Sequence, residues 1–156
     1  MKFSISKAQI AAMAGVLLLG LGGAAAYAGA ADDAIKGRQT CMKAHIKTVN
    51  GLFKMYKGET AYDGAAVQSS LAEMDSACAD WDKWWGPDTQ KGETLETWAK
   101  PEIWTDPAGF KAAGGVFYEK YLAVKATTDE AAFKVALPAL GEGCKGCHEK
   151  FRRPKE

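Results

Sequence analysis

The chain has 156 residues, of which 47% are hydrophobic and 25% are charged, with 20 lysines and arginines against 19 aspartates and glutamates. This apolar fraction is that of a folded domain and excludes a disordered tail. The nearly balanced charge excludes a basic nucleic-acid-binding protein, because no excess of cations is available to neutralise phosphates. We therefore expect no nucleic-acid partner.

The first thirty residues are typical of an export signal. Lys2 and Lys7 give a positive start, an apolar run over residues 10–21 follows, and small residues come next. A retained membrane anchor is the alternative, but the leucine-rich run is short for a span of ~20 residues. We predict a signal peptide over residues 1–30, a mature domain over residues 31–156, and a periplasmic protein of the Gram-negative type that is free of the membrane after cleavage.

Beyond the signal, apolar residues recur at spacings of three and four, and no strand alternation is visible. We predict four helices, over residues 33–57, 63–85, 106–124 and 127–153. Asp63 and Asp106 are suited to cap the second and third helices, and Gly58 to end the first. Short first and third connections predict an all-α fold, an antiparallel four-helix bundle. The long second connection is typical of an active segment or a crossover.

The strongest chemical motif lies near the C-terminus, where Cys144 and Cys147 are followed by His148. Two thiols three positions apart lie a turn apart on one helix face, which suits bonds to both vinyl groups of one porphyrin, with the adjacent imidazole on the iron. A zinc site would need further ligands, and the only other histidine is His45. A thioredoxin-like dithiol would need a strand-to-helix junction, which the sequence lacks. We predict one covalently bound haem c with its iron.

The first predicted helix carries two residues that suit such a haem. Arg38 and Met42 are four positions apart and so project from the same stripe. The arginine could pair with a haem propionate, and the methionine could ligate the iron opposite His148. A solvated arginine and a gap-filling core methionine are the alternatives.

Three blocks, taken in order, resemble the class II c-type cytochromes, which are cytochrome c′ and its low-spin relatives. Residues 35–43 are similar to the opening signature of the family, residues 99–110 to the start of its third helix, and residues 144–152 to its closing signature. The resemblance spans the whole mature chain and implies an up-down-up-down four-helix bundle.

The resemblance also implies roles for six residues around one haem. They are Cys144 and Cys147 as thioether attachments, His148 as the proximal iron ligand, Arg38 near a propionate, Arg152 beside the proximal imidazole, and Met42 in the distal position. In the low-spin branch a methionine in that position completes six-coordination, whereas a bulky residue that does not ligate leaves the iron open to small gases. The alternative for Arg152 is a solvated C-terminal charge.

Two functions follow from the distal position. With Met42 on the iron, the protein is an electron carrier for periplasmic redox partner proteins. With an open iron, it binds nitric oxide or carbon monoxide for sequestration or sensing. Neither is an enzymatic role, and His45 is expected to be a packed or surface histidine. The resemblance also allows a homodimer through the first two helices.

Cys41 and Cys78 depart from the family pattern. Cys41 lies 16 residues before Lys57, and Cys78 lies 15 residues after Asp63. In an antiparallel hairpin both therefore lie about 24 Å from the turn, at ~1.5 Å per residue. This register favours a disulfide between the two helices, and an intermolecular bridge and free buried thiols are the alternatives.

Overall fold

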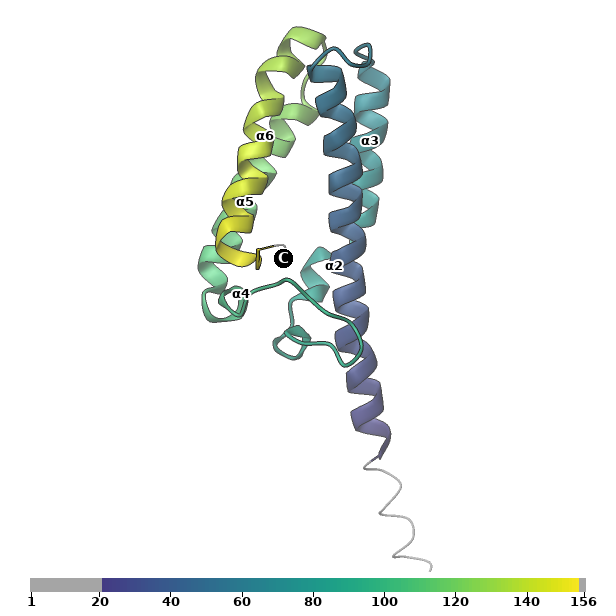
Figure 1. The fold of residues 1–156 in the computed structure, drawn as a ribbon, viewed down its shortest axis with the longest axis vertical. Coiled ribbons are helices and arrows are strands. Elements are labelled where there is room, and N and C mark those ends of the chain that lie inside the picture. Colours follow the sequence, from purple (N-terminus) through teal and green to yellow (C-terminus); the bar gives the residue numbers. More distant parts are fainter. Residues whose placement is uncertain (1–20, 155–156) are drawn as a thin grey trace, which may run out of the picture.

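The computed structural model describes the backbone of residues 21–154 and the side chains of residues 29–154, so most of the predicted signal peptide lies outside it. The described part is helical, and four long helices form its frame. They are α2 (Leu21–Tyr56), α3 (Gly64–Ala77), α5 (Pro107–Lys125) and α6 (Glu130–Phe151). Figure 1 shows α2 beside α3 and α5 beside α6, as two antiparallel hairpins packed together. The predicted all-α four-helix bundle is confirmed. Over the described residues, no helix combines the length and the hydropathy needed to cross a membrane.

The first helix begins earlier than predicted. The periodic pattern places its start at residue 33, but α2 already begins at Leu21. Half of the added residues, 21–32, are alanine, which has the highest helix propensity, so the helix extends back through a stretch that has no amphipathic pattern. The predicted domain boundary after residue 30 therefore lies inside a continuous helix.

The second helix ends earlier than predicted, because the tryptophan-rich stretch leaves it. Cys78 has φ −112° and ψ 10°, which ends α3 after Ala77. The next residues form two 3-10 helices, η1 (Trp81–Trp84) and η2 (Pro87–Thr89), and a short α4 (Glu102–Thr105) follows. Leaving the helix lets the tryptophans pack on other elements, and Trp85 lies 4.7 Å from the ring of Phe110 on α5.

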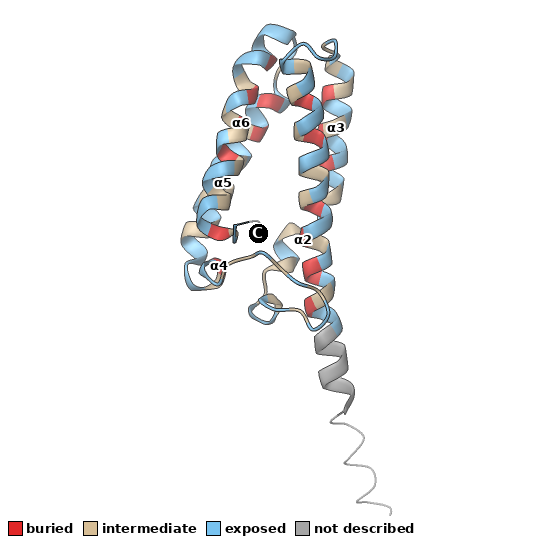
Figure 2. Cartoon of the chain, in the orientation of Figure 1, coloured by how far each residue is buried: buried red, intermediate tan, exposed pale blue. Residues whose placement is uncertain are grey.

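The hydrophobic core occupies the end of the bundle where both hairpins turn, and its buried positions are red in Figure 2. Nine buried residues from all four long helices form it, namely Leu52, Val67, Leu71, Met74, Tyr121, Val124, Phe133, Leu137 and Leu140. The Tyr121 hydroxyl donates a hydrogen bond of 2.6 Å to Asp75, and Lys125 forms an ion pair of 2.7 Å with the same carboxylate. These contacts join α3 to α5 at the rim of the core.

The start of α5 is fixed by the predicted cap. The Asp106 carboxylate accepts a hydrogen bond of 2.9 Å from the Gly109 N–H, and Pro107 occupies the first helical position. We expect Asp106→Ala to lower the free energy of unfolding by about 1 kcal/mol, measured by chemical denaturation. Asp80 makes no such cap bond, so Asp80→Ala is the matched control. Equal losses in the two variants would contradict the capping role.

A disulfide joins α2 to the end of α3. Cys41 and Cys78 are bonded with their Cα atoms 4.9 Å apart, so the predicted intrachain bridge is confirmed. Cys41 is fully buried. The ring of His45, one turn further along α2, packs against this bridge and stacks on Phe117 of α5 at a centroid distance of 5.2 Å. The expected packed histidine is therefore confirmed.

The buried His45 makes stability depend on pH. Burial, helped by the charge of His148, lowers the pKa of His45 from 6.5 to about 4. Between these values the unfolded chain binds the proton and the folded chain does not, so the free energy of unfolding falls as the pH is lowered from 6.5 towards 4. This contribution reaches at most about 3 kcal/mol. Denaturation at pH 7 and pH 4.5 should show a smaller pH effect in His45→Phe than in the unaltered protein, and equal effects would contradict the assignment.

Candidate functional site

The end of α6 opposite the core carries the cysteine motif. Cys144, Cys147 and His148 lie in the last two turns of this helix, and both cysteines are half-buried and unpaired. Burial raises the pKa of both thiols, most directly that of Cys147, where no other cause acts. A redox-active dithiol instead needs a lowered thiol pKa. The environment therefore disfavours the dithiol alternative.

His148 is half-buried and ready to act as a neutral ligand. Burial, followed by the positive charge of Arg152, lowers the pKa of His148. The ring is therefore neutral at pH 7, the state in which an imidazole nitrogen can bind a metal. The charge of Arg152 therefore acts on this imidazole.

The backbone at Arg152 differs from the sequence prediction. The pattern places Arg152 on the helix face of His148, but α6 ends at Phe151, and Arg152 is extended at φ −120° and ψ 136°. The reason is a non-local backbone pairing with the long connection. The Lys100 N–H donates a hydrogen bond of 3.0 Å to the Phe151 carbonyl, and the Arg153 N–H donates one of 2.7 Å to the Trp98 carbonyl. The Arg152 guanidinium lies 5.7 Å from the centre of the Trp98 ring.

Arg38 lies in a polar and aromatic setting supplied by the same connection. Only 5% of its surface is exposed, and its Nη2 donates to the Thr89 carbonyl at 2.6 Å. The guanidinium carbon lies 4.8 Å from the centre of the Trp85 ring and 5.6 Å from that of Trp104. Burial lowers the pKa of Arg38 to about 10, so it is still charged at neutral pH. The solvated arginine that the sequence allowed is thereby excluded.

Three buried donors around Arg38 have no hydrogen-bond partner among the described residues. They are Nε and Nη1 of Arg38 and Nε1 of Trp85. Buried donors are rarely left unpaired, and an unpaired buried cation is more costly still. An anionic group that accepts hydrogen bonds would satisfy these donors, and the propionates of a haem fit this requirement.

A series of aromatic rings connects Arg38 with the end of α6. Trp85, which stacks on Arg38, lies 4.7 Å from Phe110, and Phe110 lies 5.3 Å from Phe151, three residues after His148. The donors on α2 and the cysteine motif on α6 therefore belong to one region, at the end of the bundle away from the hydrophobic core.

Met42 lies on α2 one turn after Arg38 and is half-buried. The next turn carries His45, whose pKa is lowered in part by the charge of His148. The pKa of His45 therefore responds to a residue of α6, and Met42 lies one turn before His45 on the same helix.

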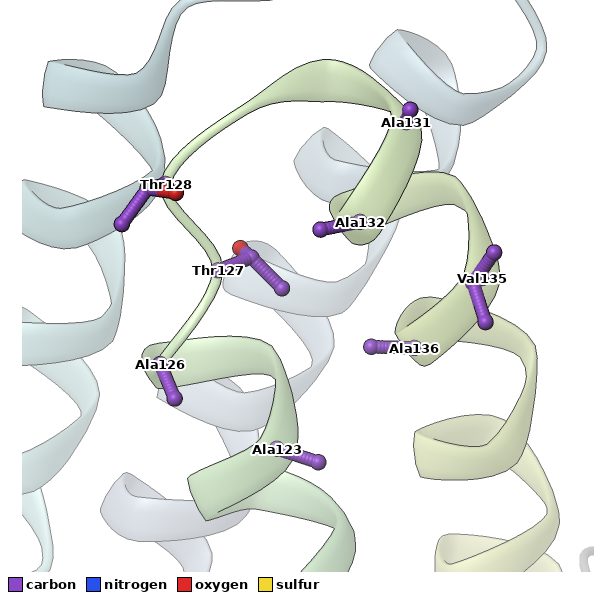
Figure 3. A pocket seen from close by; sticks show the side chains of 8 residues that line it. All are labelled: Ala123, Ala126, Thr127, Thr128, Ala131, Ala132, Val135 and Ala136. Atoms are coloured by element: carbon purple, nitrogen blue, oxygen red, sulfur yellow. The ribbon is translucent and has the colours of Figure 1, made fainter.

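A separate hollow lies at the other end of the molecule, where α5 turns into α6 (Figure 3). Its volume is about 510 Å³. Its lining consists of small apolar side chains and two threonines, namely Ala123, Ala126, Thr127, Thr128, Ala131, Ala132, Val135 and Ala136. Because it offers no charged or metal-binding side chain, the chemistry belongs to the cysteine end of α6.

Comparison with known proteins agrees with this assignment. Residues 33–152 match the family model described as Cytochrome C′. The chain belongs to the cytochrome c′ family. Members of this family bind one covalently attached haem c with iron, and the half-buried thiols, the neutral imidazole and the unpaired donors near Arg38 fit that group.

Some relatives of this chain are named cytochrome c′ and others cytochrome c-556. A cytochrome c′ from Rubrivivax gelatinosus is 34% identical over 123 residues, which are 77% of this chain and 94% of that protein. A cytochrome c-556 from Rhodopseudomonas palustris is 31% identical over 129 residues, 79% of this chain and 85% of that protein. A nitric oxide complex of a mutant cytochrome c prime from Alcaligenes xylosoxidans has a TM-score of 0.70 and 28% identity, covering 80% of this chain and 97% of that one.

Sequence reasoning missed the contribution of the long connection to this cytochrome c′ site. Thr89, Trp85 and Trp104 surround Arg38, but nothing in helical periodicity predicts the path of an irregular segment. The sequence did contain one indication of this close approach, which is the glycine at position 37, directly before Arg38. A Cβ atom at Gly37 would lie 2.4 Å from the Trp84 ring, so only glycine lets the tryptophan stretch approach α2 here.

Proposed function

We propose that this cytochrome c′ family member is an exported electron carrier in which His148 and Met42 ligate the haem iron. When bound, the haem c supplies an iron centre that exchanges one electron. Cys144 and Cys147 hold the group covalently, and His148 offers a neutral imidazole from the same helix turn. The periplasm is the compartment that suits the predicted signal peptide and the Cys41–Cys78 disulfide.

The observation that carries electron transfer is the methionine at position 42. It lies half-buried on α2, one turn from the buried Arg38 and one turn from His45, on whose pKa the charge of His148 acts. A thioether is a good ligand for haem iron and raises its reduction potential. A saturated iron leaves no position for a gas and favours electron exchange with protein partners.

Binding of a small gas is the second candidate, because solved relatives include nitric oxide complexes of cytochrome c prime. In that case Met42 is a packing residue beside an open iron. The two candidates make opposite predictions for one experiment, which is the optical spectrum of the holoprotein, oxidised and reduced, with and without carbon monoxide. A low-spin spectrum that ignores the gas supports electron transfer, whereas a high-spin spectrum that shifts with the gas supports gas binding.

Arg38 provides a second test, because we propose that its unpaired Nε and Nη1 donate to a propionate. In Arg38→Gln a buried cation beside the haem is lost, so the oxidised iron is stabilised relative to the reduced iron and the reduction potential falls. Potentiometric titration of the holoprotein measures this shift. Lys47→Gln is the control, because Lys47 is exposed and pairs with Glu73. An unchanged potential in Arg38→Gln would contradict the pairing.

A further inference from the structure

A second cluster of metal-binding side chains lies apart from the cysteine motif of α6. Nε2 of His45 is 3.3 Å from Sγ of Cys78 and 3.7 Å from Sγ of Cys41. In the part of the chain that the structure describes, this is the group in which three His, Cys, Asp or Glu ligand atoms converge, all within 4.8 Å of one another. The family signature accounts for neither cysteine of this cluster.

The spacing of these atoms is close to that of a tetrahedral metal site. Zinc binds sulfur at ~2.3 Å and imidazole nitrogen at ~2.0 to 2.1 Å, which places neighbouring ligand atoms about 3.6 to 3.8 Å apart. Both sulfur–nitrogen distances already lie near this range. Only the two sulfurs, which are now bonded to each other, would have to move apart.

His45 has the protonation state and the ring orientation that a metal ligand needs. Its ring is stacked on Phe117, which fixes the direction of Nε2 towards the sulfurs. Burial lowers the pKa of His45 to about 4, so the ring is neutral at pH 7. Asp75, which acts electrostatically on His45, is already bound by Tyr121 and Lys125 and is therefore not counted as a ligand.

We propose that the reduced form of the protein binds one thiophilic d10 cation, Zn²⁺ or Cu⁺, through Cys41, His45 and Cys78. A dithiol reductant breaks the sulfur–sulfur bond, giving two protein thiols while it becomes a disulfide itself. The metal then displaces the two thiol protons and is bound by two thiolates and one imidazole. The metal takes over the link between α2 and α3 that the disulfide provides, and the site does not depend on which function the haem performs.

Zinc binding to the reduced and the oxidised holoprotein tests the proposal. The reduced protein is made with a phosphine, freed of reductant under anaerobic conditions, and titrated with Zn²⁺ against a chromophoric chelator. We expect one Zn²⁺ per reduced chain, bound on the order of 100-fold more tightly than by the oxidised chain, which offers no thiolates. Zinc should also protect both thiols from alkylation. Equal binding by the two forms would overturn the proposal, and so would a failure of the folded protein to release two thiols.

The role of the histidine is tested separately. His45→Phe keeps the stacked ring but removes the nitrogen, and it should weaken zinc binding by the reduced protein on the order of tenfold or more. Glu73→Gln is the control for loose binding by surface carboxylates, because Glu73 is an exposed residue of α3 paired with Lys47. This variant should leave the zinc affinity of the reduced protein unchanged. Zinc binding as tight in His45→Phe as in the unaltered protein would remove His45 from the site. The comparison of zinc binding by the reduced and the oxidised protein needs no variant, so it tests the site even if His45→Phe folds poorly.

Discussion

Met42→Ala is expected to convert a low-spin protein that ignores carbon monoxide into a high-spin protein that binds it. The methionine lies half-buried on α2, one turn after Arg38, and alanine has no atom that can ligate iron. With one axial position open, the iron becomes five-coordinate. Optical spectra of the oxidised and the carbon monoxide-treated reduced protein measure both changes, and the reduction potential should fall because a thioether ligand raises it.

The matched control is Met55→Ala. Met55 is also a half-buried methionine of α2, but it packs against the core at the opposite end of the bundle. Its loss should leave the spectrum and the gas response unchanged, although it lowers stability. A low-spin spectrum in Met42→Ala would remove Met42 from the iron. A high-spin, gas-binding spectrum in the unaltered protein would do the same and would favour the gas-binding function.

Removing the disulfide is expected to cause the largest loss of stability. The bridge between Cys41 and Cys78 closes a loop with a sequence separation of 37 residues, for which the chain-entropy model gives about 4 kcal/mol. We expect the double variant Cys41→Ser, Cys78→Ser to lose an amount of this order in chemical denaturation. The fully buried position of Cys41 adds to the cost, because serine places a hydroxyl there.

The comparison that isolates the covalent bond uses the same chain, oxidised and reduced, without added metal. Both forms keep every side chain, so their difference in unfolding free energy reports the bridge alone. A difference below about 1 kcal/mol would mean that the unfolded chain gains little freedom on reduction, contrary to the entropic account.

Local patterns and helix register could be predicted from the sequence. The motif from Cys144 to His148 depends on spacing within one helix, and the cap at Asp106 depends on four consecutive residues. The disulfide was also predictable, because two helices joined by a short turn must bring residues equally far from it to the same height. These features need no knowledge of how distant segments fold.

The surroundings of the site could not be predicted, because they depend on non-local contacts. The spacing of Trp81 and Trp85 fits a helix face, yet these rings pack on Phe110 of another element, and the helix ends before them. Arg152 fits the face of His148, yet backbone pairing with residues 98–100 extends the chain there. In both cases a tertiary contact outweighed the local preference.

The long connection is hydrogen-bonded both to α2 and to the end of α6, and these contacts bear on the order in which the protein folds. The carboxylate of Asp32 on α2 accepts hydrogen bonds from the backbone of Thr94 and Leu95, and the neighbouring residues 98–100 pair with the end of α6. These contacts join positions about fifty to sixty apart in the chain, so they form late, after the local hairpins. We therefore expect the connection to pair with the end of α6 only after the two hairpins have formed.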